Sequence, residues 1–157
     1  TLVDQDGRTV TEKDFAGRYM LVYFGYTFCP DVCPLDAQKL ATALRTFEKQ
    51  DPARAAKVVP VFVTVDPERD TTAVLKDFVT AFHPRLVGLG GSVAQVDAAK
   101  KAYRVYAKKA GPEGAADYLI DHTAMIYLMG PDGAPISFTD HTGTADQIAA
   151  DLDKYVR

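Results

Sequence analysis

The chain contains two cysteines, Cys29 and Cys33, with three residues between them. They follow the apolar run Met20–Phe24 and precede a stretch with helical spacing of apolar residues. We therefore expect both sulfur atoms at a junction between a strand and a helix N-terminus, which favours the thiolate over the thiol. Two thiolates at one site can form a disulfide or hold a soft metal ion.

Histidines are further side chains that can bind such a metal, and the chain has three of them. His83 precedes Pro84 after a predicted helix, and we interpret it as a solvated turn residue. His141 follows a predicted hairpin, where a role in a turn or helix cap is favoured. His122 directly precedes a predicted buried strand, so its position relative to the cysteines depends on the fold.

Composition indicates one globular domain over residues 1–157, because 47% of the residues are hydrophobic and can form a core. The net charge of −3 gives no basic surface for nucleic acid, and no nucleic-acid partner is predicted. No apolar run reaches the roughly 18 residues of a membrane span. Because the chain begins at Thr1, we expect the soluble part of a protein from which an N-terminal membrane anchor has been removed.

The hydrophobic pattern predicts alternating strands and helices. Strands are expected at Leu2–Val3, Thr9–Val10, Met20–Gly25, Val58–Val65, Leu86–Leu89, Thr123–Met129 and Ile136–Thr139, and helices at Pro34–Gln50, Thr71–Phe82, Ser92–Ala107 and from Thr144 onward. Capping-box patterns at 92–95 and 144–147 mark the starts of the last two helices. Two hairpins are expected, one around Asp6-Gly7 and one around Pro131-Asp132-Gly133.

Three local signals refine these elements. Pro60 indicates that the strand over 58–65 lies at a sheet edge or carries a bulge near its start, because proline cannot donate a ladder hydrogen bond. We interpret Asp66–Asp70 as a charged turn in which Asp70 caps the following helix. The polar segment Lys108–Asp117 is expected to be a variable, moving loop that leads into His122.

The order of elements predicts an α/β thioredoxin-like fold, with a central mixed β-sheet flanked by helices and an N-terminal hairpin. The cysteines then follow the carboxyl end of the first core strand, where α/β sheets commonly carry their sites. In this layout the residues entering the strand after His122 run beside the cysteines. Redox enzymes of this layout usually have a cis-proline there, whereas this chain has Asp121-His122.

Two chemistries fit these residue types. Two thiolates and an imidazole suit Cu(I) or Cu(II), and they can also hold zinc with an open position. Thiol–disulfide exchange needs only the two cysteines. The residue types alone leave both open, whereas a purely structural disulfide is disfavoured because the loop it closes is short.

Three segments together resemble the Sco family, which are copper-binding, thioredoxin-fold proteins that assist assembly of cytochrome c oxidase. These segments are Tyr23–Pro34 (YFGYTFCPDVCP), Val63–Thr71 (VTVDPERDT) and Asp121–Gly133 (DHTAMIYLMGPDG). The resemblance extends over nearly the whole chain, in order and with matching spacing. A CxxxC motif alone would be weak, whereas the three segments together are specific.

The resemblance implies that Cys29, Cys33 and His122 are the ligands of one copper ion. It implies a non-enzymatic copper metallochaperone that assists assembly of the CuA centre in cytochrome c oxidase subunit II. A periplasmic copper donor or thiol reductase would be a further partner. The alternative is a thiol–disulfide oxidoreductase in which Cys29 and Cys33 are the redox-active pair and reduce the cysteines of that copper site.

The resemblance also implies a location for the domain. Sco proteins are typically tethered by one N-terminal helix and face the bacterial periplasm or the mitochondrial intermembrane space. We expect the periplasmic face of the bacterial inner membrane rather than the mitochondrial compartment.

Overall fold

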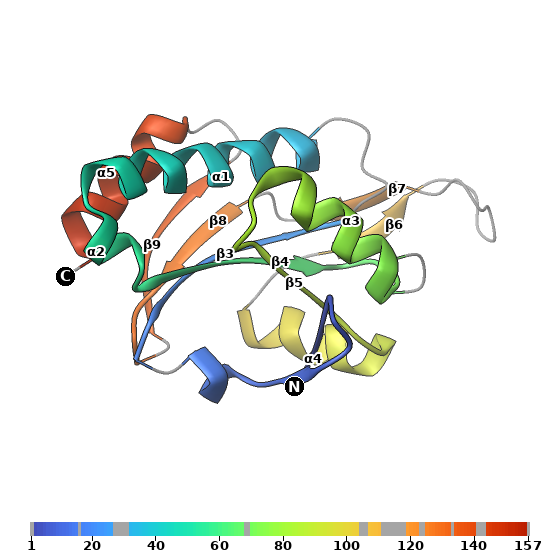
Figure 1. The fold of residues 1–157 in the computed structure, drawn as a ribbon. Helices are drawn as coiled ribbons and strands as arrows, with labels where there is room; N and C mark the ends of the chain where they lie inside the picture. The colour runs from blue at the N-terminus through green and yellow to red at the C-terminus, as the bar shows by residue number, and fades with distance from the viewer. Residues whose placement is uncertain are drawn as a thin grey trace.

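The computed structural model describes residues 2–15, 17–26, 32–67, 70–103, 107–110, 119–122, 125–132, 134–140 and 144–156. Seven strands form a mixed sheet in the order β2-β1-β5-β4-β3-β8-β9, and β6 and β7 form a separate two-stranded sheet (Figure 1). The strands are β1 (Leu2–Asp4), β2 (Thr9–Val10), β3 (Tyr19–Gly25), β4 (Val58–Thr64), β5 (Val87–Gly90), β6 (Ala107–Ala110), β7 (Leu119–His122), β8 (Met125–Met129) and β9 (Pro135–Asp140). The helices are η1 (Glu12–Phe15, a 3-10 helix), α1 (Val32–Gln50), α2 (Pro52–Ala55), α3 (Thr72–Phe82), α4 (Val93–Tyr103) and α5 (Ala145–Tyr155).

The centre of the sheet is formed by β3, β4 and β5, which run parallel. Every residue of β3 and β4 is buried, which explains why both read as continuous apolar runs instead of alternating patterns. β8 pairs antiparallel with β3, and β9 pairs antiparallel with β8. On the other side, β1 joins β5 and forms the expected N-terminal hairpin with β2.

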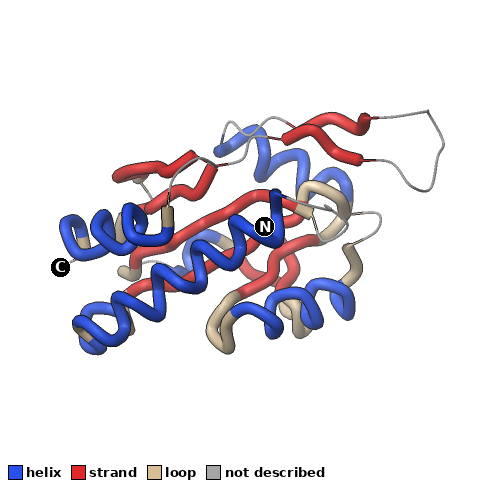
Figure 2. The backbone as a smooth tube through the Cα atoms, turned by 90° about the horizontal axis from the view of Figure 1, so that it is seen from above, coloured by secondary structure: helices blue, strands red, loops and turns tan. Residues whose placement is uncertain are grey.

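Helices cover both faces of the sheet. Figure 1 shows α1, α3 and α5 on one face, and η1 and α4 on the other. Figure 2 shows α1 and α5 packed side by side over the sheet, and the two helices are in contact. α1 packs into the core through Leu40, Leu44 and Phe47, none of which is more than 1% exposed. The predicted thioredoxin-like architecture is therefore confirmed.

Three local predictions about helices, strands and loops were wrong. α4 ends at Tyr103 instead of Ala107. The predicted loop Lys108–Asp117 begins with strand residues, because Ala107–Ala110 form β6, which pairs antiparallel with β7, and residues 111–117 lie outside the described residues. Alanine and lysine favour helix, but pairing with a partner strand overrides that preference. Pro60 lies in a central strand, and the ladder with β5 begins one residue later, at Val61. Its missing N–H therefore costs no hydrogen bond to β5.

The capping predictions were right in two places and wrong in one. Thr144 and Gln147 form a capping box at the start of α5, and Ser92 and Gln95 exchange the same pair of hydrogen bonds before α4. Thr71, instead of Asp70, caps α3, because its Oγ1 accepts from the Val74 N–H. Within the described residues, no helix combines the length and apolar character that crossing a bilayer requires.

Candidate functional site

The junction between β3 and α1 carries the two cysteines. β3 ends at Gly25, α1 begins at Val32, and Cys33 is the second residue of the helix. Cys29 lies outside the described residues, as does the Cys33 side chain. The first turn of α1 contains no acidic residue, although Asp31 directly precedes the helix in the sequence. The start of a helix is the positive end of its dipole, so the backbone here favours negative charge nearby.

The segment that carries His122 reaches the same edge of the sheet. His122 is the last residue of β7, and β8 begins three positions later at Met125. β8 runs antiparallel to β3, with Ile126 opposite Tyr23, so the start of β8 lies beside the carboxyl end of β3. Figure 1 shows the β6–β7 hairpin and the first turns of α1 on the same side of the molecule. The described backbone thus follows the predicted layout.

The ligand set itself stays a prediction. The side chain of His122, like those of the cysteines, lies outside the described residues, and so does the whole of His141. The described residues give the arrangement of the elements that lead to these side chains. The start of α1 and the end of β7 lie toward the same edge of the sheet.

The carboxyl end of β4 lies next to this junction and is closely hydrogen-bonded. The Val65 N–H donates to the Gly25 carbonyl at 2.8 Å, which joins the ends of β3 and β4. The hydroxyl of Thr64 makes two hydrogen bonds. It donates to Asp70 Oδ2 at 2.6 Å and accepts from the Asp66 N–H at 2.9 Å. These bonds fix the turn that follows β4.

The predicted charged turn at 66–70 thus follows β4, but its two aspartates are buried. Asp66 is 1% exposed and Asp70 is 3% exposed, whereas Glu68 and Arg69 lie outside the described residues. Two buried carboxylates thus lie at the edge of the sheet where β3 ends. Thr64 is the signal that sequence reasoning overlooked, because a threonine ending a buried strand can satisfy a nearby carboxylate.

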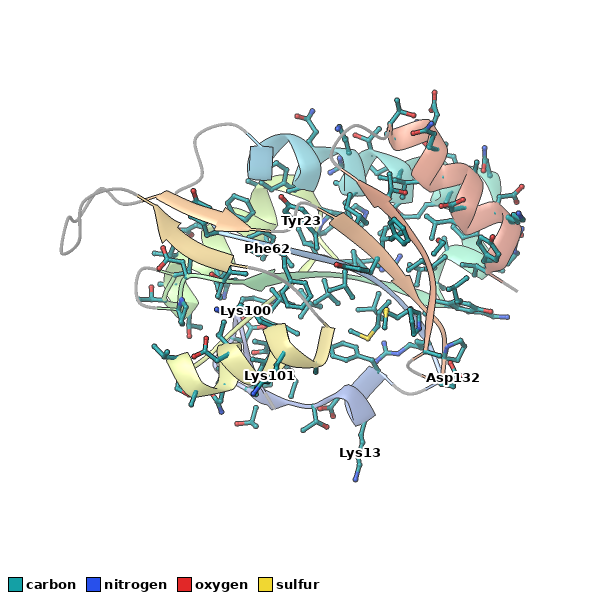
Figure 3. The ribbon with its side chains drawn as sticks, turned by 180° about the vertical axis from the view of Figure 1, so that it is seen from behind. Lys13, Tyr23, Phe62, Lys100, Lys101 and Asp132 are labelled. Carbon is teal, nitrogen blue, oxygen red and sulfur yellow. The ribbon has the colours of Figure 1, made fainter. Side chains whose placement is uncertain are left out.

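Aromatic packing supports this end of the sheet from within. The ring centroids of Tyr23 on β3 and Phe62 on β4 lie 6.1 Å apart, and the angle between the two ring planes is 40° (Figure 3). The ring centroids of Phe62 and Phe78 of α3 lie 4.8 Å apart, and those of Phe78 and Phe82 lie 4.9 Å apart. This row connects the strand that leads to the cysteines with α3, and Tyr23 is fully buried in it.

His83 belongs to a different part of the molecule. It is 3% exposed, which contradicts the prediction of a solvated turn residue. Its Nε2 lies 2.8 Å from Glu48 Oε1, and its Nδ1 accepts the Arg85 N–H at 3.0 Å. Because a backbone N–H can only donate, Nδ1 must be the acceptor, and Nε2 carries the proton towards Glu48. Glu48 is near the C-terminus of α1, far from Cys33, and local sequence gives no sign of this contact.

Comparison with known proteins agrees with the fold and the motifs. The model of the SCO1/SenC family matches residues 1–157. The human mitochondrial SCO2 homolog is 42% identical over 158 residues, which cover 99% of this chain and 58% of that protein. The chain thus spans little more than half the length of this relative.

Two solved structures are also similar. ScoI from Bradyrhizobium japonicum, solved with copper bound, is 44% identical, with a TM-score of 0.86 over 99% of this chain and 96% of that one. BsSco, a member of the Sco family of cytochrome c oxidase assembly proteins with an identified disulfide switch, is 26% identical, with a TM-score of 0.76 over 98% of this chain and 89% of that one. With a match over its full length, the chain belongs to the SCO1/SenC family.

Proposed function

We propose that this chain is the copper-binding domain of a metallochaperone that assists assembly of the CuA centre of cytochrome c oxidase. Cys29, Cys33 and His122 hold one copper ion, which is the cargo of the protein. Two sulfur donors and one imidazole nitrogen form a soft set that suits Cu(I) and also accepts Cu(II). The copper-bound relative ScoI supports the choice of metal.

One observation carries the proposal. The start of α1, with Cys33 in its first turn, and the end of β7, with His122 as its last residue, lead to the same edge of the sheet. The two segments are far apart in sequence, and the antiparallel β3–β8 pairing brings them there. This supports one site built from both segments rather than a cysteine pair acting alone.

The redox state of the pair controls the copper site in this proposal. When the two copper-bound thiolates pass two electrons to the disulfide of an oxidising partner, that partner takes up two protons and becomes a dithiol. The Cys29–Cys33 disulfide that forms has lost both sulfur ligands, so oxidation releases the metal. The target is subunit II of the oxidase, and a copper donor or thiol reductase restores the loaded or reduced state. The domain acts at the periplasmic face of the inner membrane, held by an N-terminal anchor.

A second function has its own support. The first turn of a 19-residue helix without acidic residues favours a thiolate at Cys33, and this is what disulfide exchange also needs. In that case one cysteine attacks a disulfide of the target and the other resolves the mixed disulfide. Two electrons and two protons then pass to the target, and this pair ends as a disulfide.

Anaerobic titration of the reduced protein with Cu(I), against a competing chelator, separates the two functions. The wild type should bind one ion tightly, and His122→Ala should weaken the affinity by about tenfold or more, since even indirect partners of a metal ligand contribute that much. His141→Ala is the matched control and should bind like the wild type.

Copper binding that is equally strong in His122→Ala would contradict a three-ligand site. The oxidoreductase would then be tested by the rate at which the reduced protein transfers electrons to a disulfide-containing peptide. Loss of that transfer in Cys29→Ser, with His122→Ala unaffected, would establish it.

A further inference from the structure

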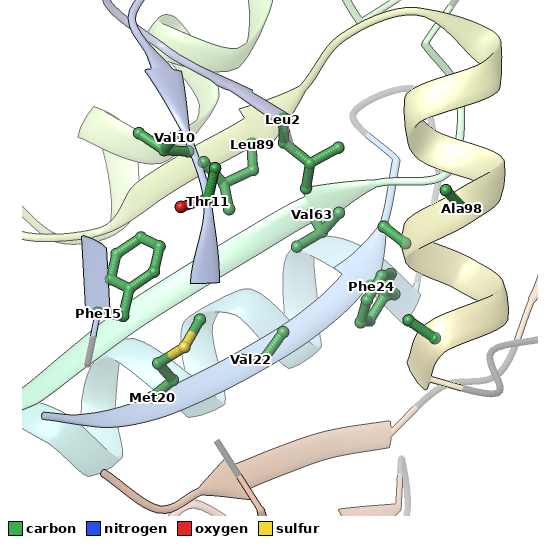
Figure 4. A pocket seen from close by; sticks show the side chains of 12 residues that line it. Leu2, Val10, Thr11, Phe15, Met20, Val22, Phe24, Val63, Leu89 and Ala98 are labelled. Atoms are coloured by element: carbon green, nitrogen blue, oxygen red, sulfur yellow. The ribbon is translucent and has the colours of Figure 1, made fainter. Parts of the chain in front are cut away.

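A cavity of about 270 Å³ lies on the face of the sheet opposite α1, between the strands and α4 (Figure 4). β3 contributes Met20, Val22 and Phe24 to its wall, and these side chains are at most 8% exposed. The N-terminal segment closes another side with Leu2 and Phe15, which are also buried. The third wall is α4.

The composition of α4 explains why this space is open. The helix turns Ala98, Ala99 and Ala102 toward the cavity, and a methyl group is too small to fill it. α4 packs Val96 into the core, with 0% of its surface exposed. Alanine strongly favours helix, so α4 forms well although it fills little of the space beneath it.

The lining is chemically uniform. None of the twelve described residues that line the cavity carries a charge, and Thr11 is the one with a polar side chain. Its Oγ1 already accepts the Lys13 N–H, at 3.3 Å. An enclosed apolar cavity of about 150 Å³ accepts benzene, so the larger, partly open space here suits a substituted ring.

The cavity also has a route to the surface. Ala98 and Ala102 line it and are themselves exposed, which places its opening along α4. The inner wall presents the Met20 thioether and the rings of Phe15 and Phe24, and sulfur and ring edges both contact aromatic ligands favourably.

We propose that this cavity is a binding site for a small, uncharged, apolar molecule of the alkylbenzene class. The ring lies against Met20 and Phe24, and the alkyl chain extends toward the alanines of α4. The site is on the opposite face of the sheet from α1 and requires no copper. This proposal can therefore be tested independently of the metallochaperone function.

The test uses the reduced, metal-free chain with n-butylbenzene as the probe. Labelling the methionine methyl groups gives a direct reporter, because Met20 is one of three methionines in the chain. Saturable shifts of the Met20 methyl signal, with nuclear Overhauser contacts from that methyl to the probe, are the expected result. Absence of these contacts at saturating probe would overturn the proposal.

Two variants of α4 sharpen the test. Ala99→Leu places an isobutyl group in the cavity and should weaken binding by about tenfold or more. Ala94→Leu makes the same change at an exposed position of the same helix that does not line the cavity, and it should bind like the wild type. Equal binding by both variants would overturn the assignment, and the methyl contacts in the wild type decide the matter if Ala99→Leu fails to fold.

Discussion

Replacing His83 by alanine tests whether this histidine serves stability alone. The substitution removes the Nε2–H bond to Glu48 and the acceptor of the Arg85 N–H. A hydrogen bond to a charged group contributes about 1.5–3 kcal/mol, and an ordinary one contributes about 0.5–1.5 kcal/mol. Glu48 keeps 32% of its side chain exposed, so water partly replaces the lost bond there.

We therefore expect His83→Ala to lower the free energy of unfolding by about 3 kcal/mol, which is about 6–12 °C in Tm for a chain of this size. Urea denaturation at pH 7, followed by circular dichroism, measures the loss. His83→Asn is the matched variant, because its Oδ1 can accept the Arg85 N–H in place of Nδ1. It should lose clearly less than alanine.

Copper binding gives the complementary readout. Glu48 lies 15 residues beyond Cys33 in α1 (48 − 33), which is about 22 Å along the helix. The Cu(I) affinity of folded His83→Ala should therefore equal that of the wild type. A loss of stability below about 1 kcal/mol, or a loss equally large in His83→Asn, would refute the hydrogen-bond argument. Weakened copper binding would refute the spatial separation.

Other substitutions probe the turns and the sheet. Gly91→Ala should cost about 1–2 kcal/mol in urea denaturation, because φ is +139° and the added Cβ would clash with Gln95 Oε1, which caps α4. No loss would mean that this turn readily rearranges. Thr64→Val should cost about 2–3 kcal/mol by the same measurement, because the buried Asp70 carboxylate loses a charge-assisted bond, and Thr64→Ser should retain most of it. Burial raises the pKa of the Tyr127 hydroxyl above 10.0, so the folded state holds this proton more tightly than the unfolded state and loses stability as the pH rises past 10.0. Tyr127→Phe should remove this alkaline loss of stability. Parallel profiles of unfolding free energy against pH for the two proteins would contradict it.

The elements that the sequence predicts best are those whose burial is complete. β3 and β4 are buried along their whole length, and a continuous apolar run is what such strands require. α5 was found from Thr144 and Gln147, because a capping box is a local signal with a local cause.

Most of the failures share a different cause, which is contact between segments far apart in the chain. β6 is a strand because β7 pairs with it, and nothing within Ala107–Ala110 indicates that partner. His83 can be buried because Glu48, 35 residues earlier, accepts a hydrogen bond from its Nε2–H. Pro60 suits a central strand because the ladder with β5 begins one residue later. For the candidate site, the backbone layout follows from the order of elements, and the ligand set rests on the motifs.

The two halves of the candidate site stand on supports of unequal strength. Cys33 begins a helix that buries Leu40, Leu44 and Phe47 and packs against both the sheet and α5. His122 ends β7, whose described pairing is with β6 alone, outside the seven-stranded sheet. A two-stranded hairpin is only marginally stable by itself, whereas a buried helix opens only at a cost near that of global unfolding. The helix that begins beside Cys33 is thus anchored by the core, whereas the described pairing of the strand that ends at His122 is with β6. In the copper site proposed above, the nitrogen ligand would therefore be easier to release than the Cys33 sulfur, and this asymmetry would suit a protein that must bind a metal ion and then pass it on.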